Sequence, residues 1–152
     1  VHGARAGARL EGARVVLLGA GGAGSAIAVA LLESGVRELT LHDESHARLS
    51  ELSALLADFG PGRVRPGPPD PTGCDMVCNA TPAGMKDGDP LPIDISKLVS
   101  SSYCGCVITK PAVSPFIAAA REKGCVTGTG TEMYESLQGK MVDFLLFADK
   151  EA

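Results

Sequence analysis

Short apolar runs alternate along this chain with longer segments in which apolar residues recur every three or four positions. Six of the short runs have the length and composition of strands, at residues 14–18, 38–42, 63–65, 74–80, 103–108 and 125–127. Four of the longer segments have helical spacing, at residues 22–34, 45–59, 115–123 and 131–148. Strands that alternate with helices predict βαβ units. We therefore expect one α/β domain over residues 1–152, a doubly wound parallel sheet with helices on both faces, in three layers.

Charge and cysteine content exclude several classes of protein. The chain has 14 Lys and Arg against 18 Asp and Glu, a net charge of −4, without the basic stripe of a nucleic-acid-binding surface. No apolar run approaches the roughly 20 residues of a membrane span. Five cysteines, without zinc-ligand spacing or a secretory leader, predict reduced, buried thiols in the cytoplasm and no metal site. The chain does not begin with Met, which suggests a piece of a longer protein.

Glycine is the compositional outlier, at 19 of 152 residues. Four of these glycines fall together after the first predicted strand, where Gly19, Gly21 and Gly24 form the pattern G-x-G-x-x-G. In that pattern the first glycine makes the turn, the second lets a pyrophosphate approach the backbone, and the third lets the helix pack closely on the sheet. The sequence predicts that Gly19, Ala20, Gly21, Gly22, Ala23 and Gly24 bind the phosphates of a dinucleotide, so the sheet is of the Rossmann type. A tight βα turn without a ligand stays open as an alternative.

Asp43 stands at the end of the second predicted strand, where an acidic residue binds the ribose of a dinucleotide. A carboxylate there accepts hydrogen bonds from an unmodified ribose and repels a 2′-phosphate, and Glu44 adds a second negative charge. Arg48, one helical turn later, carries a positive charge, which would favour a 2′-phosphate instead. The pattern favours NAD over NADP. The alternative is that Asp43 only caps the helix that follows.

A second loop follows the fourth predicted strand and reads Asn79-Ala-Thr81-Pro82-Ala-Gly84-Met85. In a parallel sheet this loop lies at the carboxyl edge, where ligands bind. Together with the glycine loop it resembles the shikimate/quinate dehydrogenase family, specifically the C-terminal nucleotide-binding domain of that family. Three later segments are similar too: Cys106–Pro115, the glycines Gly128 and Gly130, and Gln138 before the apolar end of the last predicted helix.

The resemblance implies a site for each part of the ligand. Asn79, Thr81, Pro82 and Met85 would line the cofactor on the side of the second loop, whereas Ile108, Gly128 and Gly130 would flank the nicotinamide. Gln138 and Thr109 would reach the substrate. It also implies hydride transfer between the nicotinamide and a cyclic hydroxy acid of the shikimate or quinate class.

The chain departs from the family pattern at several positions. Thr109 stands where most members have Tyr, and the spacing from Met133 to Gln138 is one residue longer than usual. Asp43-Glu44-Ser45 replaces the Asn-Arg-Thr of NADP-using members, which again favours NAD. The family's catalytic Lys and Asp belong to an N-terminal substrate domain that is absent from this sequence, so no catalytic residue is assigned. Two other functions stay open: an NAD-binding module that senses redox state, and a dehydrogenase domain of another substrate class.

Overall fold

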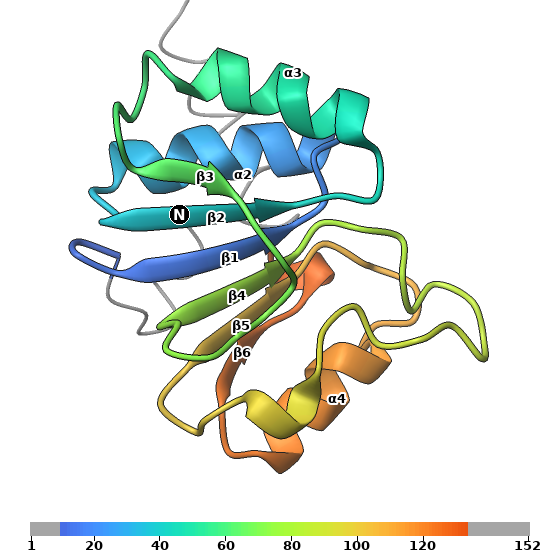
Figure 1. The fold of residues 1–152 in the computed structure, drawn as a ribbon. Coiled ribbons are helices and arrows are strands. Elements are labelled where there is room, and N and C mark those ends of the chain that lie inside the picture. Colours follow the sequence, from blue (N-terminus) through green and yellow to red (C-terminus); the bar gives the residue numbers. More distant parts are fainter. Residues whose placement is uncertain (1–9, 134–152) are drawn as a thin grey trace, which may run out of the picture.

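Six parallel strands form a single sheet in the computed structural model, which describes residues 10–133 (Figure 1). The strands are β1 (Arg14–Leu18), β2 (Glu38–His42), β3 (Val64–Pro66), β4 (Met76–Asn79), β5 (Tyr103–Cys106) and β6 (Val126–Gly128). Their order in the sheet is β3-β2-β1-β4-β5-β6. The chain therefore winds outward from β1 to β3, crosses to β4, and winds outward again to β6. This doubly wound order confirms the predicted Rossmann-type sheet.

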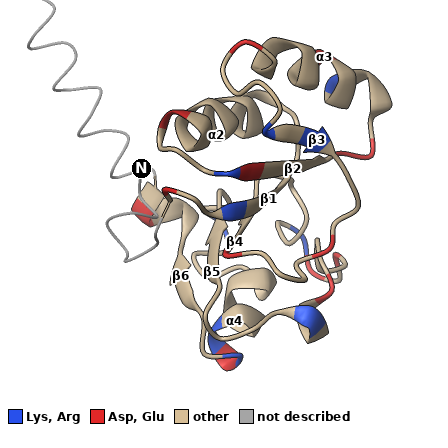
Figure 2. Cartoon of the chain, turned by 60° about the vertical axis from the view of Figure 1, so that its left-hand side comes forward, with Lys and Arg blue, Asp and Glu red and all other residues tan. Residues whose placement is uncertain are grey.

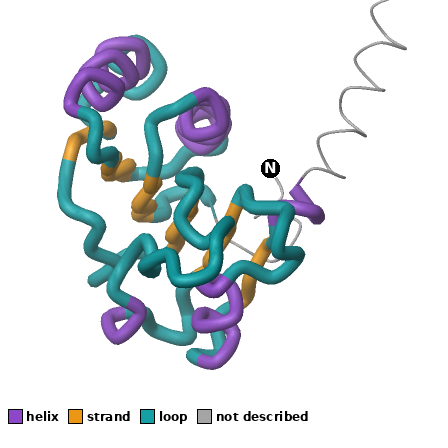
Figure 3. Tube along the Cα trace, turned by 90° about the vertical axis from the view of Figure 1, so that its right-hand side faces the viewer, coloured by secondary structure: helices purple, strands orange, loops and turns teal. Residues whose placement is uncertain are grey.

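Helices cover both faces of the sheet. The helices α2 (Gly22–Glu33) and α3 (His46–Leu56) lie on one face, and α4 (Pro115–Glu122) lies on the other with the short 3₁₀ helix η1 (Ile95–Lys97) (Figure 3). Successive side chains of β1 point to opposite faces, as the pleat requires. Val15 and Leu17 pack with α2 and α3, whereas Val16 and Leu18 pack with α4. The three layers predicted from the sequence are confirmed.

The element ends differ from the prediction by a few residues. The predicted strands 74–80 and 103–108 are shorter, at Met76–Asn79 and Tyr103–Cys106, while β3 and β6 each lie one residue later than expected. The predicted helix 45–59 spans only His46–Leu56. It starts one residue later because Ser45 is its cap and accepts the N–H of Arg48 with its side chain. The sequence did not predict η1. Of the predicted helix 131–148, all but residues 131–133 lies outside the described residues.

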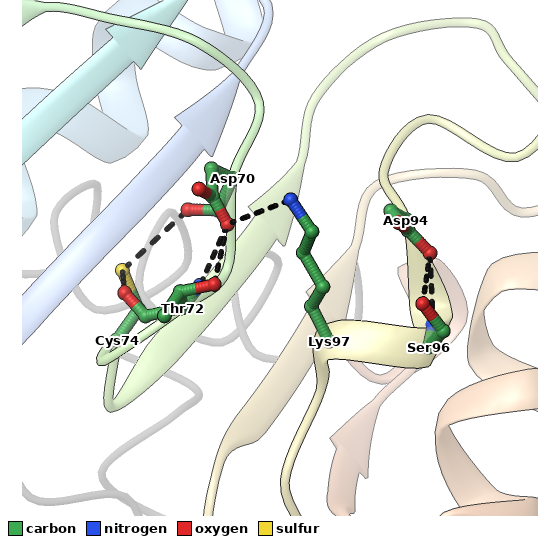
Figure 4. A network of polar contacts seen from close by, with 6 residues as sticks. All are labelled: Asp70, Thr72, Cys74, Asp94, Ser96 and Lys97. Carbon is green, nitrogen blue, oxygen red and sulfur yellow. Dashed lines mark hydrogen bonds and ion pairs between the residues drawn. The ribbon is translucent and has the colours of Figure 1, made fainter.

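The connections on either side of β4 are loops without an α-helix, and polar contacts hold them in place. Lys97 of η1 lies 3.8 Å from a carboxylate oxygen of Asp70, which also accepts the N–H and hydroxyl of Thr72 (Figure 4). Asp94 holds Ser96 in the same way at the start of η1. These hydrogen bonds keep the pKa of each aspartate below its ordinary value. The network fastens the segment before β4 to η1.

Four of the five cysteines are small buried residues, as the sequence predicts, and Cys74 is the exception. Cys74 is half-buried, and all five are free thiols. Burial raises the pKa of Cys78 to about 12 and also raises that of Cys104, so both stay protonated at neutral pH. Within residues 10–133 no group of three or more His, Cys, Asp or Glu side chains is placed to hold a metal ion.

Charged residues of both signs are interspersed over the described elements (Figure 2). Between residues 10 and 133, no helix has the length and apolar character needed to cross a membrane.

Candidate functional site

The glycine loop lies at the point where the strand order of the sheet reverses, between β1 and β4. Gly19 has a φ of +103°, and a Cβ there would lie 2.7 Å from the carbonyl oxygen of Ala80. A Cβ at Gly24 would lie only 2.0 Å from the carbonyl oxygen of Gly19. The fold itself thus requires glycine at both positions, as the sequence predicts for the turn and for close helix packing.

Gly21 and Gly22 are different, because a Cβ at either one would meet no described atom within 4 Å. Gly21 has a φ of −81°, which any residue adopts. Neither packing nor backbone conformation among the described residues explains these two glycines. A ligand lying against the backbone would explain both.

The backbone N–H groups of the loop divide into two sets. The N–H of Gly19 donates to the carbonyl oxygen of His42 at 2.8 Å, and that of Ala20 donates to Oδ2 of Asp43 at 2.8 Å. The next four N–H groups, those of residues 21–24, donate to no atom within residues 10–133. They form the start of α2, where the helix dipole adds positive potential. Four N–H donors without a partner among the described residues, on open backbone, are the kind of arrangement that binds anions in proteins.

The start of α2 is also unlike the starts of the neighbouring helices. Side-chain oxygens of Ser45, Asp94 and Ser114 cap α3, η1 and α4 respectively. Thr129 and Glu132 hold each other in a capping box where the chain leaves β6. No side chain caps α2. Of the helix starts that the structure describes, this one alone lacks a side-chain partner.

Asp43 lies beside the glycine loop and is bound on both of its oxygens. Oδ2 accepts the N–H of Ala20, Oδ1 accepts the N–H of Ser45 at 2.7 Å, and the guanidinium of Arg48 lies 3.7 Å from Oδ1. Burial alone would raise the pKa of this carboxyl, but the two backbone hydrogen bonds and the charge of Arg48 lower it below its ordinary value. Asp43 is therefore a carboxylate at neutral pH. It is not the cap of α3, since Ser45 fills that position.

The side chain of Asn79 holds the second loop, residues 79–85, through hydrogen bonds to Thr81. The Asn79 side chain has 0% exposure, and its Oδ1 accepts both the N–H and the hydroxyl of Thr81. The hydroxyl oxygen of Thr81 in turn accepts the N–H of Ala83. The sequence predicts Asn79 as a cofactor contact, but the structure turns its amide into the loop, where it positions Thr81. Thr81 is half-buried, and Pro82 and Met85 are exposed at the same edge.

Asp89 is a functional candidate that the sequence reasoning missed. Its Oδ2 accepts the N–H of Gly84 at 3.0 Å and that of Lys86 at 3.2 Å, which closes the second loop around Met85. Its signal in the sequence is weak, because an aspartate among glycines and prolines is typical of any turn.

The ends of β5 and β6 bring the remaining predicted residues together. A Cβ at Gly84 would lie 3.6 Å from Cδ1 of Ile108, and one at Gly130 would lie 2.2 Å from the carbonyl oxygen of Ile108. Ile108 and Gly128 are buried, and Thr109 is exposed at the edge. Gln138 lies outside the described residues. No signal in the sequence indicated how closely the backbones of Ile108 and Gly130 approach each other.

The candidate residues thus follow the carboxyl ends of five adjacent strands. In sheet order these are Asp43 after β2, residues 19–24 after β1, residues 79–85 after β4, Ile108 and Thr109 after β5, and Gly128 and Gly130 at the end of β6. The middle of this line presents backbone N–H donors, and the two ends offer a carboxylate on one side and glycine backbone on the other. An extended ligand with a central diphosphate fits this order.

Comparison with known proteins finds one matching family model and several similar curated proteins. The ThiF family matches residues 1–58, which include β1, the glycine loop, α2, β2 and α3. A shikimate dehydrogenase (NADP⁺) of Arthrobacter sp. strain FB24 is 39% identical over 147 residues, covering 91% of this chain and 49% of that protein. The chain spans about half the length of the curated relatives it matches.

Two solved structures are similar over most of the chain. The quinate dehydrogenase of Corynebacterium glutamicum in complex with NAD has a TM-score of 0.74 and 33% identity, covering 84% of this chain and 47% of that one. The ligand-free 5-ketofructose reductase of Gluconobacter sp. strain CHM43 has a TM-score of 0.76 and 30% identity, covering 86% of this chain and 50% of that one.

Proposed function

This chain belongs to the shikimate/quinate dehydrogenase family, and we propose that it is the nicotinamide-dinucleotide-binding domain of a dehydrogenase. The observation that carries the proposal is the start of α2, where the N–H groups of residues 21–24 have no partner within residues 10–133 and no side chain caps the helix. These donors would hold the pyrophosphate of the cofactor. Gly21 and Gly22 leave the space that the phosphates need.

The rest of the carboxyl edge accommodates the two ends of such a cofactor. Asp43 lies on the β2 side, where the adenosine ribose would bind, and Thr81, Pro82 and Met85 would line the cofactor from the second loop. Ile108, Gly128 and Gly130 lie on the β5 and β6 side, where the nicotinamide would bind. Asn79 contributes by holding Thr81 in position.

We favour NAD over NADP as the cofactor. Asp43 and Glu44 are two adjacent acidic residues after β2, at the place where a 2′-phosphate would need positive charge. Arg48 is the nearby cation, and its guanidinium lies 3.7 Å from the carboxylate of Asp43, which partly neutralises it. The related quinate dehydrogenase of Corynebacterium glutamicum holds NAD, whereas the Arthrobacter relative is named for NADP⁺.

The activity that we propose for the whole protein is reversible oxidation of a secondary alcohol in a cyclic hydroxy acid of the shikimate or quinate class. The bound nicotinamide would supply the hydride chemistry. The described residues would orient the cofactor and exclude water, while the catalytic Lys and Asp of the family would come from an N-terminal substrate domain. The five free thiols fit a protein of the cytoplasm.

A second candidate is reduction of a keto sugar, and Thr109 is the observation that favours it. The family usually has Tyr at this position, and the shorter, exposed Thr109 leaves more room at the substrate end of the edge. The similarity to 5-ketofructose reductase shows that this scaffold also occurs with a substrate that is not a carboxylic acid.

Titration of the chain with NADH and NADPH tests the proposal through the fluorescence of the reduced nicotinamide. We expect saturable binding with NADH the tighter ligand, and no turnover of quinate, shikimate or 5-ketofructose by the 152 residues alone. Turnover of one of these by the full-length parent protein would then identify the substrate class. Binding without turnover of any of them by the parent protein would favour a redox-sensing module, and absence of binding would refute the proposed function.

A further inference from the structure

We propose that Asp43 is a positioning residue of the glycine loop, in addition to any contact with the ribose. Its carboxylate holds the N–H of Ala20 and thereby fixes the turn that presents the N–H groups of residues 21–24. The inference rests on the proposed dinucleotide function and deepens it. Its consequence is that binding of NADH and of NADPH both depend on Asp43, although a carboxylate at the ribose alone would favour one and oppose the other.

The end of β2 holds the beginning of the loop at two successive residues. The carbonyl oxygen of His42 accepts the N–H of Gly19, and the side chain of Asp43 accepts the N–H of Ala20, each at 2.8 Å. The free donors begin at the next residue, Gly21. Asp43 therefore stands at the boundary between the part of the loop that the protein holds and the part that a phosphate would hold.

The carboxylate is also fastened from its other side. Oδ1 accepts the N–H of Ser45 at 2.7 Å and faces the guanidinium of Arg48, and the side chain of Asp43 is only 8% exposed. Each oxygen of the carboxylate therefore accepts one backbone N–H, Oδ2 from Ala20 and Oδ1 from Ser45, and Arg48 adds an ion pair at 3.7 Å. Both oxygens of Asp43 are thus already engaged by the protein in the ligand-free chain. The carboxylate is well equipped to tie the glycine loop to the start of α3.

Within residues 10–133 the N–H of Ala20 donates only to Asp43. Ala20 is 7% exposed, so its N–H would lose its partner in a region that water reaches poorly if the carboxylate were removed. Such an unpaired donor drives the turn toward another conformation. The free N–H groups of residues 21–24 would then no longer converge on one phosphate position.

The variants Asp43→Ala and Asp43→Asn separate the two roles when NADH and NADPH are titrated by fluorescence. We expect Asp43→Ala to weaken NADH by about tenfold, the effect of losing one charge-assisted hydrogen bond, and to weaken NADPH by a smaller factor, because the charge that opposes a 2′-phosphate is removed as well. Asp43→Asn keeps one oxygen acceptor, which can serve Ala20 while the amide nitrogen faces Ser45 and Arg48, so we expect a smaller loss of NADH affinity than in Asp43→Ala. Asp58→Ala, which removes an exposed carboxylate beyond the other end of α3, is the matched control and should change neither affinity.

Amide hydrogen exchange supplies a readout that does not depend on the cofactor. In the ligand-free chain the N–H of Ala20 should be protected in the wild type and in Asp43→Asn, and unprotected in Asp43→Ala. The inference is overturned if Asp43→Ala weakens NADH but spares or strengthens NADPH, or if the N–H of Ala20 stays protected. If Asp43→Ala does not fold, the exchange of Ala20 in Asp43→Asn decides, and loss of protection there counts against the inference. If the wild type binds neither cofactor, the proposed function fails, and exchange at Ala20 still tests the anchoring contact.

Discussion

The side-chain oxygen of Asn79 accepts two hydrogen bonds from Thr81, one from the backbone N–H at 3.0 Å and one from the hydroxyl at 2.6 Å. Asn79 is the last residue of β4 and is fully buried, so its amide is the fixed end of this contact. Thr81 lies in the loop and next to the glycine turn, since its Cγ2 would be 3.2 Å from a Cβ added at Gly19. The pair therefore fixes the second loop relative to β4, next to the glycine turn.

Replacement of Asn79 by Ala should destabilise the fold and loosen the second loop. It leaves both donors of Thr81 without their acceptor, which costs about 1–3 kcal/mol in the free energy of unfolding. Urea denaturation measures that loss, and NADH titration should show weaker binding by the molecules that remain folded. Thr81→Ser keeps the hydroxyl and is the matched control. Unchanged stability in Asn79→Ala would contradict the positioning role of this amide.

Replacement by alanine should change stability very differently at two glycines of the glycine loop. Gly24→Ala places a Cβ 2.0 Å from the carbonyl oxygen of Gly19, and we expect a loss of about 3 kcal/mol in the free energy of unfolding. Gly21→Ala meets open space and an ordinary φ, so stability should change by no more than about 1 kcal/mol.

The same two variants differ in what they do to the ligand. Because the space beside Gly21 is where a phosphate would lie, Gly21→Ala should lower NADH affinity by about tenfold or more in a fully folded protein. Thermal melting and NADH titration of the two variants side by side check both expectations. If Gly21→Ala binds NADH like the wild type, the phosphate does not lie against this backbone.

The strands and helices could be predicted from the pattern of apolar residues. The loops that follow the strands at the carboxyl edge could be predicted as well. Each of the six strands was expected within about two residues, because short apolar runs between glycines and prolines have few other stable arrangements. The short helix η1 was missed, since a single turn of three residues has no periodicity to detect. The ends of β4 and β5 were predicted one or two residues too far out, because tertiary pairing decides where a ladder stops.

The partners of the site residues were harder to predict than their positions. The sequence shows Asp43 at the end of a strand, but not that its two oxygens bind Ala20 and Ser45. It likewise shows Asn79 in a loop motif, but not that its amide faces inward. Both facts depend on side-chain direction in three dimensions. The pattern of residue types along one chain does not determine that direction.

Arg63 is predicted to matter for stability and not for the ligand. Its guanidinium donates to the carbonyl oxygens of Leu32, Val36 and Phe59, and so joins the ends of α2 and α3 ahead of β3. Arg63→Ala should lower the free energy of unfolding by about 2–3 kcal/mol, since three carbonyls lose a charged donor. Arg63→Lys has no fork of donors and should recover only part of the loss. Urea denaturation checks the ranking, and NADH affinity of the folded variants should equal that of the wild type.

The contribution of Asp43 to stability should depend on pH in one direction only. Its pKa in the folded chain is lowered below its ordinary value, because the hydrogen bonds from Ala20 and Ser45 and the charge of Arg48 outweigh the effect of burial. A lowered pKa in the folded state means that the unfolded chain binds the proton first, at about pH 3.9. The stabilisation is therefore complete above that pH and is lost as the pH falls through the folded pKa.

Urea denaturation of the wild type and of Asp43→Asn between pH 3 and pH 7 measures this dependence. We expect the difference in unfolding free energy between the two proteins to be constant above about pH 5 and to shrink below about pH 4, because protonated Asp43 carries no charge, as Asn carries none. Comparing the two proteins removes the contribution of the other carboxyl groups, including Asp70 and Asp94, whose pKa values are also lowered. A difference that grows on acidification would mean that Asp43 is protonated more readily in the folded chain than in the unfolded one, contrary to its contacts with Ala20, Ser45 and Arg48.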